Sequence, residues 1–263
     1  LQHLHTKRLR PDKKACRVLV LSPTRELSGQ ISDSFRAYGR HIRPLAIALA
    51  IGGVPINKQV RSLAHGVEVL VATPGRLLDL VNQRALRLDQ VEVLVLDEAD
   101  RMLDMGFIHD IKRIVAMLRK ERQTLFFSAT MPQEITRLAD AMLRDPARVA
   151  VTPQATTVER IAQRVILTDK PAKPALLVDV LKTETTDRIL VFTRTKHGAD
   201  KVVRHLQKSG FGAEAIHGNK SQNQRERVLG DFRTGKLRIL IATDIAARGI
   251  DVDGVSHVVN YDL

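Results

Sequence analysis

The chain has 263 residues, 44% of them hydrophobic, which is enough for about two domains with buried cores. Its 42 Lys and Arg residues exceed its 29 Asp and Glu residues by 13, which favours a polyanionic partner, most simply nucleic acid, although a solvated basic surface would give the same count. The single cysteine, Cys16, excludes an intrachain disulfide or a thiolate metal cluster, and no apolar run approaches the roughly 20 residues of a membrane span, so we expect a protein of a reducing compartment such as the cytoplasm.

The first 151 residues alternate between short apolar runs and amphipathic stretches with helical spacing. Strands are predicted near residues 18–21, 45–51, 67–72, 91–96 and 124–127, and helices near 27–38, 56–63, 75–81, 108–118 and 132–143. Strands that alternate with helices in this way are typical of a parallel sheet flanked by helices.

The alternation pauses at residues 152–160, a polar stretch containing Pro153 that is predicted to be a linker. It resumes with strands near 161–167, 189–192, 213–216, 239–242 and 255–260, and helices near 173–181, 199–209 and 222–232. Ser221 and Gln224 fit a capping box at the start of the last helix. The sequence therefore predicts an α/β protein of two domains, residues 1–151 and 161–263, each with a parallel sheet flanked by helices.

Three carboxylates follow the apolar run that ends near residue 96: Asp97, Glu98 and Asp100. In open parallel sheets, ligands bind beyond the carboxyl ends of the strands. Two adjacent carboxylates there can hold a hydrated Mg²⁺ and orient a water, which nucleotide hydrolysis requires. A strand that runs into an acidic turn is the plain alternative.

Two other strands run directly into helix starts that carry a hydroxyl and a guanidinium. Thr24 and Arg25 follow the strand at 18–21, and Thr73, Gly75 and Arg76 follow the strand at 67–72. Helix-start amides together with these side chains can cradle phosphates. Ordinary helix capping explains either start alone, but two such starts on one sheet edge favour a phosphate track.

Two further strand ends carry small or hydroxyl residues. Gly53, in the pair that ends the strand at 45–51, is either part of a plain turn or a third point where a backbone approaches a ligand. Ser128 and Thr130 follow the strand at 124–127, and their hydroxyls could bond the carboxylates of residues 97–100 if the two strands are neighbours. Capping of the helix that begins near Pro132 is an equal alternative.

In the second half, the strand at 239–242 is followed by Thr243, which could touch a phosphate, and by Asp251, which could accept a hydrogen bond from a ribose hydroxyl. Residues 230–236 fit the Gly-x-x-x-x-Gly-Lys spacing of a phosphate loop, but Leu237 stands where Ser or Thr should bind Mg²⁺. That segment also runs from a predicted helix into a predicted strand, the reverse of a phosphate loop. We therefore interpret it as a helix-ending loop.

Taken in order, these residues make the chain resemble the DEAD-box ATP-dependent RNA helicases over nearly all of its length, and it is most similar to the bacterial RhlE-like branch. The motifs that carry the resemblance are Pro-Thr-Arg-Glu-Leu at 23–27, Gly-Gly at 52–53, Thr-Pro-Gly-Arg at 73–76, Asp-Glu-Ala-Asp at 97–100, Ser-Ala-Thr at 128–130, Val-Phe-Thr-Arg at 191–194, Gln222 with Arg225, and residues 243–251.

The resemblance implies two RecA-like domains, joined by a short linker, that close on ATP and RNA. It gives Mg²⁺ to Asp97 and the attacking water to Glu98, and it makes Asp100, Ser128 and Thr130 the link between hydrolysis and closure. The implied RNA-backbone residues are Thr24, Arg25, Gly53, Thr73, Gly75, Arg76, Arg194, Arg225 and Thr243, and the implied nucleotide contacts are Asp97, Gly249 and Asp251. Because aromatic residues make up only 3% of the chain, we expect phosphate contacts that are independent of base sequence.

The family's phosphate loop and adenine-reading Gln motif should precede Leu1, and its arginine-finger motif should follow Leu263. We therefore expect an internal fragment, truncated at both ends, that is not catalytically competent by itself, and we assign the activity to the parent protein. Two other interpretations stay open. A non-catalytic RNA-binding module would lack an upstream Gly-Lys-Thr, and a DNA helicase of the same superfamily would be stimulated by DNA.

Overall fold

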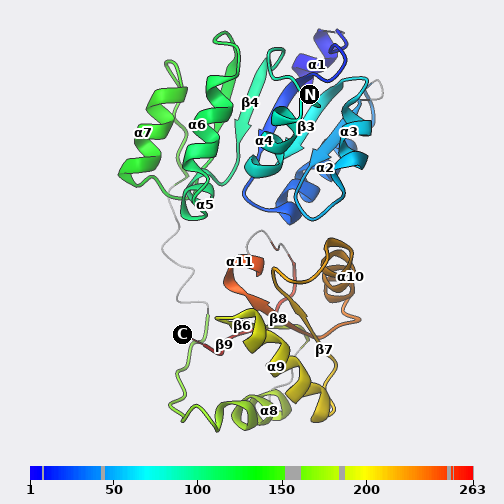
Figure 1. The fold of residues 1–263 in the computed structure, drawn as a ribbon. Helices are drawn as coiled ribbons and strands as arrows, with labels where there is room; N and C mark the ends of the chain where they lie inside the picture. The colour runs from blue at the N-terminus through cyan, green and yellow to red at the C-terminus, as the bar shows by residue number, and fades with distance from the viewer. Residues whose placement is uncertain are drawn as a thin grey trace. The chain divides into compact units, whose positions relative to one another are not determined.

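The computed structural model describes residues 1–7, 9–42, 45–151, 161–183, 187–247, 250 and 252–262. The chain divides into two compact units, Leu1–Pro146 and Ala147–Leu263 (Figure 1). Each unit is built on a parallel sheet with flanking helices, which confirms the predicted α/β class. The predicted linker at 152–160 lies outside the described residues.

The described strands of the first unit form one sheet in the order β2-β3-β1-β4-β5, with every pairing parallel. They are β1 (Cys16–Leu21), β2 (Ile47–Ala50), β3 (Val67–Ala72), β4 (Val93–Leu96) and β5 (Gln123–Phe126). The helices are α1 (Gln2–Thr6), α2 (Arg25–Gly39), α3 (Ile56–Leu63), α4 (Pro74–Asn82), α5 (Ala99–Asp104), α6 (Ile108–Ala116) and α7 (Gln133–Met142). Because the strands are parallel, all of them end at one edge, here the carboxyl edge, and begin at the other, the amino edge.

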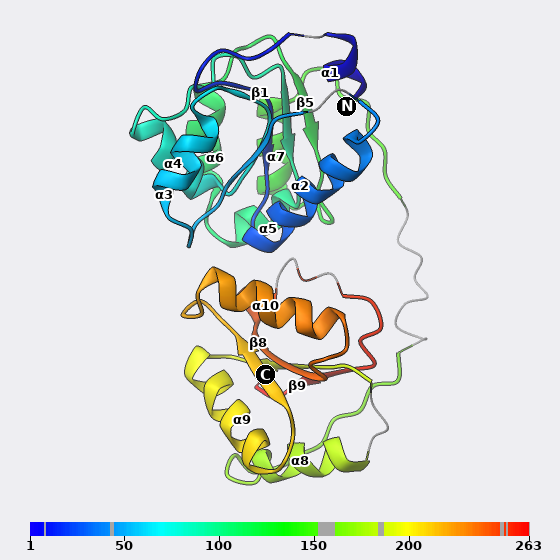
Figure 2. The same ribbon diagram turned by 90° about the vertical axis from the view of Figure 1, so that its right-hand side faces the viewer.

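Helices cover both faces of this sheet, which explains why its inner strands read as unbroken apolar runs. The apolar side chains of α3 to α7 pack on one face with Leu19 and Leu94, and those of α1 and α2 pack on the other with Val18 and Val69. Figure 2 shows α2 on one side of the sheet and α3 and α4 on the other. Every residue of β1 and β3 is buried.

The second unit has a four-stranded parallel sheet among its described residues, in the order β7-β8-β6-β9. Its strands are β6 (Ile189–Thr193), β7 (Ala213–Ile216), β8 (Ile239–Thr243) and β9 (His257–Asn260). Its helices are α8 (Lys173–Thr183), α9 (Lys196–Lys208), α10 (Gln222–Arg233) and α11 (Asp244–Ala247). The apolar side chains of α8 and α9 pack on one face of this sheet, and those of α10 pack on the other.

The strand predicted at 161–167 is wrong. The segment is rich in apolar residues, but every residue of it is exposed, including Val165 at 83% and Leu167 at 93%. A strand is stable only when its backbone pairs with a neighbour, and no described strand pairs with this segment. Apolar composition alone therefore did not decide the structure here.

Two local predictions are confirmed by backbone geometry. Ser221 caps α10 with a complete capping box, in which its hydroxyl accepts from the Gln224 amide at 3.3 Å. Residues 230–236 run from the end of α10 through Gly235, with φ of +77°, towards β8, so they form a helix-ending loop. In the described part of the chain, no helix combines the length and apolar character that crossing a membrane requires.

Candidate functional site

The carboxyl edge of the first sheet brings together the site residues predicted in the first half of the chain. Thr24 follows β1, Thr73 follows β3, Asp97 follows β4 and Ser128 follows β5. The registers align the last residues of adjacent strands, such as Leu21 with Leu96 and Leu96 with Phe126. The chain segments that follow these strands therefore leave the sheet side by side.

The first helix start is held by a network of hydroxyls. Thr24 is the N-cap of α2, and its Oγ1 accepts a hydrogen bond from the Leu27 amide at 3.2 Å. The Ser28 hydroxyl donates to the Thr24 carbonyl at 2.8 Å and lies 2.7 Å from the Ser22 hydroxyl. Thr24 is 6% exposed, so its side chain serves the helix, and the helix-start backbone is left to meet an anion at the edge.

Arg25 explains the paired glycines that follow β2. Gly53 has φ of +74°, and a Cβ atom built there would overlap the Arg25 guanidinium. A Cβ at Gly52 would lie 3.2 Å from Nη2 of the same side chain. The glycine pair therefore provides the room in which Arg25 lies across the loop, and the guanidinium is fixed at the sheet edge.

The second helix start is at α4. Thr73 is its N-cap residue and Pro74 its first residue, as predicted, although the Thr73 side chain makes no capping hydrogen bond. Arg76 donates from Nη1 to the Val54 carbonyl at 2.8 Å, and its Nε lies 3.6 Å from Oδ2 of Asp79. Arg76 therefore ties the glycine loop to α4, while a Cβ at Gly75 would meet open space.

Asp97 and Glu98 lie where β4 passes into α5. The Asp97 amide still donates to the Leu21 carbonyl of β1 at 3.0 Å, and its Oδ1 accepts from the Glu98 amide at 3.1 Å. Glu98 has a left-handed backbone, with φ of 52° and ψ of 53°, which costs a non-glycine residue of the order of 1 kcal/mol. This strained turn sets the two carboxylates beside each other at the strand end.

The Glu98 carboxylate is only partly satisfied. Its Oε2 is buried and accepts no hydrogen bond within the described part of the chain, and Nη1 of Arg101 lies 3.5 Å away. Burial raises the pKa of Glu98, against the opposing charge of Arg101. Burial also raises the pKa of Asp97, and the hydrogen bond from the Glu98 amide opposes that shift. A cation beside these carboxyls would therefore stabilise their charged forms, and the raised pKa makes Glu98 a better acceptor for a proton from water.

Asp100, in the first turn of α5 after β4, is hydrogen-bonded to the segment that follows β5. Its Oδ2 accepts from the Thr130 amide at 2.9 Å and from the Thr130 hydroxyl at 2.7 Å, and its own amide donates to the Ser128 hydroxyl at 3.2 Å. Burial acts to raise the pKa of Asp100, but the hydrogen bonds from Thr130 and Ser128 outweigh it and hold the pKa below its ordinary value. The expected hydroxyl–carboxylate hydrogen bond is present for Thr130, whereas the Ser128 hydroxyl accepts from the Asp100 amide and donates to the Thr130 carbonyl at 2.7 Å.

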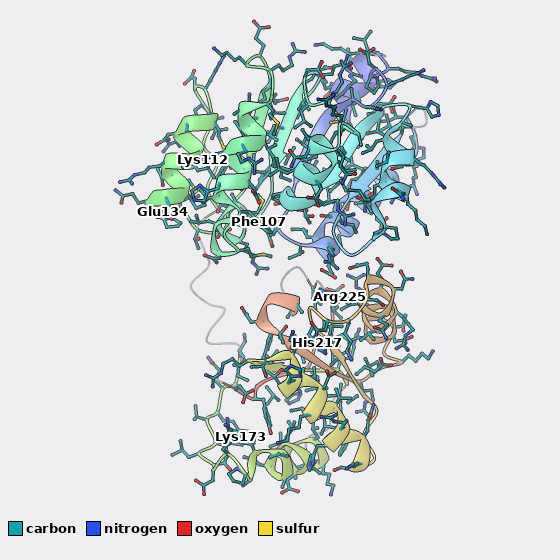
Figure 3. The ribbon with its side chains drawn as sticks, viewed as in Figure 1. Phe107, Lys112, Glu134, Lys173, His217 and Arg225 are labelled. Atoms are coloured by element: carbon teal, nitrogen blue, oxygen red, sulfur yellow. The ribbon has the colours of Figure 1, made fainter. Side chains whose placement is uncertain are left out.

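In the second unit, the predicted site residues take different positions. Arg194 follows β6 and is exposed, with its amide donating to Oδ2 of Asp262 at 3.3 Å. Thr243 ends β8 and is partly exposed. Arg225 is 8% exposed and donates to the Ala246 carbonyl at 3.4 Å, so it braces α11 (Figure 3). Gly249 and Asp251 lie outside the described residues.

Sequence reasoning missed a cluster around the buried His217 at the carboxyl end of β7. His217 is 2% exposed, and its Nε2 lies 3.1 Å from Oδ1 of Asp200, which also accepts from Nζ of Lys220 at 3.0 Å (Figure 3). Nearby, Nζ of Lys196 donates to Oδ1 of Asn219 at 3.1 Å. The cluster fixes the loop between β7 and α10, and the histidine directly after an apolar strand was the available signal.

A divalent cation fits the first sheet's carboxyl edge only as a shared site. Among the described residues, no three His, Cys, Asp or Glu side chains converge as a metal site. Mg²⁺, however, is usually bound through one or two carboxylates, several waters and the phosphates of a substrate. The Asp97 carboxylate and the buried, unbonded Oε2 of Glu98 match that pattern.

Comparisons with known proteins agree with this geometry. The DEAD/DEAH box helicase family model matches residues 1–138, and the helicase conserved C-terminal domain model matches residues 172–263. The RNA helicase CrhR of Synechocystis sp. is 44% identical over 246 residues, which cover 93% of this chain and 50% of that protein. The ATP-dependent RNA helicase dbp2 of Schizosaccharomyces pombe is 45% identical over 250 residues, or 94% of this chain and 45% of that protein.

Among solved structures, S. cerevisiae Dbp5 bound to RNA and ADP BeF3 is similar, with a TM-score of 0.83 and 29% identity over 98% of this chain and 66% of that chain. The chain spans about half the length of the curated relatives it matches. Because one family model covers more than half of the residues and a second covers most of the remainder, the chain belongs to the DEAD/DEAH box helicase family.

Proposed function

We propose that this chain is part of an ATP-dependent RNA helicase that couples ATP hydrolysis to RNA binding and local duplex separation. The observation that carries the proposal is the first sheet's carboxyl edge, where Asp97, Glu98 and Asp100 lie beside two helix starts that present Arg25 and Arg76. Coupled hydrolysis and RNA binding require carboxylates that hold a metal-bound nucleotide and cations that hold a phosphate backbone. Both kinds of group lie on this one edge.

Within this proposal, Asp97 would hold Mg²⁺ with the phosphates of ATP, and Glu98 would orient the attacking water and accept its proton. The metal, when bound, would neutralise negative charge on the phosphates. The raised pKa of Glu98, caused first by burial, suits a group that takes up a proton. Asp100, Ser128 and Thr130 would transmit the state of the nucleotide, because their hydrogen bonds tie the acidic segment to the segment after β5.

The RNA backbone would run along the helix starts of the first unit, meeting Arg25, Gly53 and the α4 turn. Thr24 and Thr73, 6% and 9% exposed, would act by shaping those turns. On the second unit, Arg194 and Thr243 would contact the RNA backbone, and Arg225 would act through α11. Gly249 and Asp251 are proposed as nucleotide contacts on the sequence resemblance alone.

We further propose that the chain is an internal part of a longer protein that supplies the phosphate loop and the arginine fingers. The outer position of β5 supports this, because Leu125 in β5 and Phe127 directly after it are 37% and 52% exposed, whereas the strands of parallel sheets are ordinarily covered. Membership of the RhlE-like branch stays a prediction from sequence. A cytoplasmic location is proposed on the single, fully buried thiol of Cys16.

The test is ATP hydrolysis by the longer protein with single-stranded RNA, single-stranded DNA or no nucleic acid. The proposal predicts stimulation by RNA and little by DNA. Stimulation by DNA alone would indicate a DNA helicase of the same superfamily. RNA binding without hydrolysis under any condition would indicate the alternative, a non-catalytic RNA-binding module.

A further inference from the structure

The amino edge of the first sheet, opposite the proposed site, is strongly basic. The three sequence segments that enter β1, β4 and β5 at this edge, residues 7–14, 84–92 and 117–122, contain ten Lys and Arg residues against four Asp and Glu residues. Part of that charge is paired, since Arg87 bonds Asp89 at 2.8 Å and lies 3.8 Å from Asp12. The three segments nevertheless carry a net excess of six positive charges.

A pocket of about 350 Å³ opens in this edge, between α1, the segment before β5 and the start of β5. Its cationic lining includes Lys7, Arg119 and Arg122, and its acidic lining is Glu92 and Glu121. In Figure 2, α1 and β5 lie at the same end of the first unit.

The Glu92 carboxylate is already neutralised. Arg17 donates to it from Nε at 2.6 Å and from Nη2 at 3.2 Å, and Nε2 of His3 lies 2.6 Å from its Oε2. The Arg17 hydrogen bonds are the main reason that the pKa of Glu92 falls to about 2. Arg17 and His3 therefore already pair with Glu92, and Glu121 is the other acidic residue that lines the pocket with the three cations.

One donor of the pocket lining, Nε of Arg122, is buried and unpartnered within the described residues. Nη1 of the same side chain donates to the Arg119 carbonyl at 2.7 Å. Burial first, and then the nearby charge of Arg144, lower the pKa of Arg122, which marks an environment short of negative charge. A buried guanidinium N–H that meets no protein acceptor is available to an anion or a water that enters the pocket.

We propose that this pocket is a second phosphate-binding site, which holds the backbone of an RNA strand at the sheet edge opposite the helicase track. The proposal rests on the RNA binding proposed above. Guanidinium groups match phosphate oxygens in bidentate geometry. An acidic protein partner fits less well, because Leu9 is the only apolar residue among those lining the pocket, whereas protein interfaces depend on buried apolar or aromatic anchors.

Only an RNA strand of sufficient length can occupy both sites at once. The edges are separated by the length of β1, six residues or about 20 Å. At about 3.4 Å per stacked nucleotide, a strand needs at least about six nucleotides to cover that distance in addition to those that each site holds. A short strand therefore occupies one site, and a long strand can occupy both.

The experiment measures RNA affinity of the 263-residue chain by fluorescence anisotropy over a range of salt, with unstructured strands of about 6 and about 24 nucleotides. The test variant is Lys7→Glu with Arg119→Glu. The matched control is Lys112→Glu with Arg113→Glu, the same charge change on the exposed side of α6, where Figure 3 labels Lys112. Arg76→Ala reports on the carboxyl edge, and thiol reactivity of the buried Cys16 shows that each variant is folded.

We expect the test variant to weaken binding of the long strand about 10-fold and to reduce its salt slope by about one to two units. Its affinity for the short strand should change less than about twofold, and the control should change neither. Equal losses for both strands, or an equal loss in the control, would overturn the second site and indicate a general charge effect.

The same variants separate this inference from the proposed function. If Arg76→Ala weakens binding and the Lys7/Arg119 variant does not, the second site is wrong and the helicase track stands. If neither weakens binding, or the chain binds neither strand, both proposals are wrong. If the Lys7/Arg119 variant loses a polyglutamate probe but keeps RNA, the pocket takes an acidic protein instead.

Discussion

Thr130 gives two hydrogen bonds to a single carboxylate oxygen, Oδ2 of Asp100, one from its amide and one from its hydroxyl. Thr130 lies beyond β5 and Asp100 lies in the first turn of α5, so this contact spans 30 residues of sequence. Through it, a movement of the acidic segment would be passed to the segment that leads into α7.

Thr130→Val removes the hydroxyl donor but keeps the side-chain shape, and Thr130→Ser keeps the donor. A hydrogen bond to a charged group is worth about 1.5–3 kcal/mol, reduced here because Thr130 is exposed. We expect faster amide hydrogen exchange at residues 128–131 in Thr130→Val and near-normal exchange in Thr130→Ser. Equal protection in the two variants would mean that the hydroxyl does not hold this segment.

Three glycines at the carboxyl edge should respond differently to alanine. Gly53→Ala should destabilise the first unit by about 1 kcal/mol or more, because its positive φ and the Arg25 guanidinium both oppose a Cβ. Gly52→Ala should cost less, since its Cβ would meet Nη2 of Arg25 at 3.2 Å. Gly75→Ala should be neutral or stabilising, because it begins a helix in open space.

RNA binding provides the second measurement for these variants. If the backbone at Gly75 approaches RNA, Gly75→Ala should weaken RNA affinity without loss of stability. Denaturation, monitored by the exposure of Cys16, measures the stability of each variant. Fluorescence anisotropy with a short RNA measures its RNA affinity, so the two effects are separated. Unchanged RNA affinity in Gly75→Ala would remove that residue from the proposed track.

Glu92 makes the first unit sensitive to acid. Its folded pKa of about 2 lies below the ordinary 4.5, so the carboxylate stabilises the fold above about pH 4.5, and this contribution is lost as the pH falls towards 2. The shift corresponds to at most about 3 kcal/mol, and the Glu92 side chain is 18% exposed.

Cys16 provides the readout, because it is buried beside Arg17 and burial raises the pKa of its thiol to about 12. Global unfolding exposes this thiol, so its labelling by an acid-tolerant reagent such as a pyridyl disulfide reports the stability of the first unit. Between pH 4.5 and 2 the parent should lose more stability than Glu92→Gln, which lacks the titrating group. Parallel pH profiles for the two proteins would contradict the assigned role.

The sequence predicted those parts of the fold that depend on uninterrupted local patterns. The runs at 67–72 and 91–96 became inner strands because both of their faces are covered, and the hydroxyl of Thr130 contacts Asp100 because β4 and β5 are neighbours. The strand prediction at 161–167 failed because an apolar segment does not by itself provide a pairing partner.

Other features depend on contacts that no local spacing encodes. The cluster of Asp200, His217 and Lys220 forms only when α9 packs against the sheet that contains β7. Likewise, Arg225 resembles a surface phosphate contact in sequence, but the structure turns it towards the Ala246 carbonyl. The reason for the glycine pair at 52–53 is the side chain of Arg25, 27 residues away from Gly52 in the chain.

The 263-residue chain by itself should hydrolyse no ATP above background, with or without RNA. Asp97 and Glu98 are present, but the proposal above assigns the phosphate loop and the arginine fingers to the longer protein, and arginine fingers contribute roughly 10³- to 10⁵-fold in rate where they act. Lys236 cannot replace the lysine of a phosphate loop, because its loop runs from a helix into a strand. Phosphate release by the purified chain is the assay, with Glu98→Gln as the control for contaminating enzymes. Hydrolysis that disappears in this variant would show that the chain is competent without flanking segments.

The most direct test of the central claim is the rate of RNA-stimulated ATP hydrolysis by the longer protein carrying Glu98→Gln. The amide keeps the size of the side chain but cannot accept a proton from water, so we predict a fall of about 10²- to 10⁴-fold, with ATP-dependent RNA affinity nearly unchanged. Turnover within about threefold of the parent would contradict the assignment of the first sheet's carboxyl edge as the hydrolytic site.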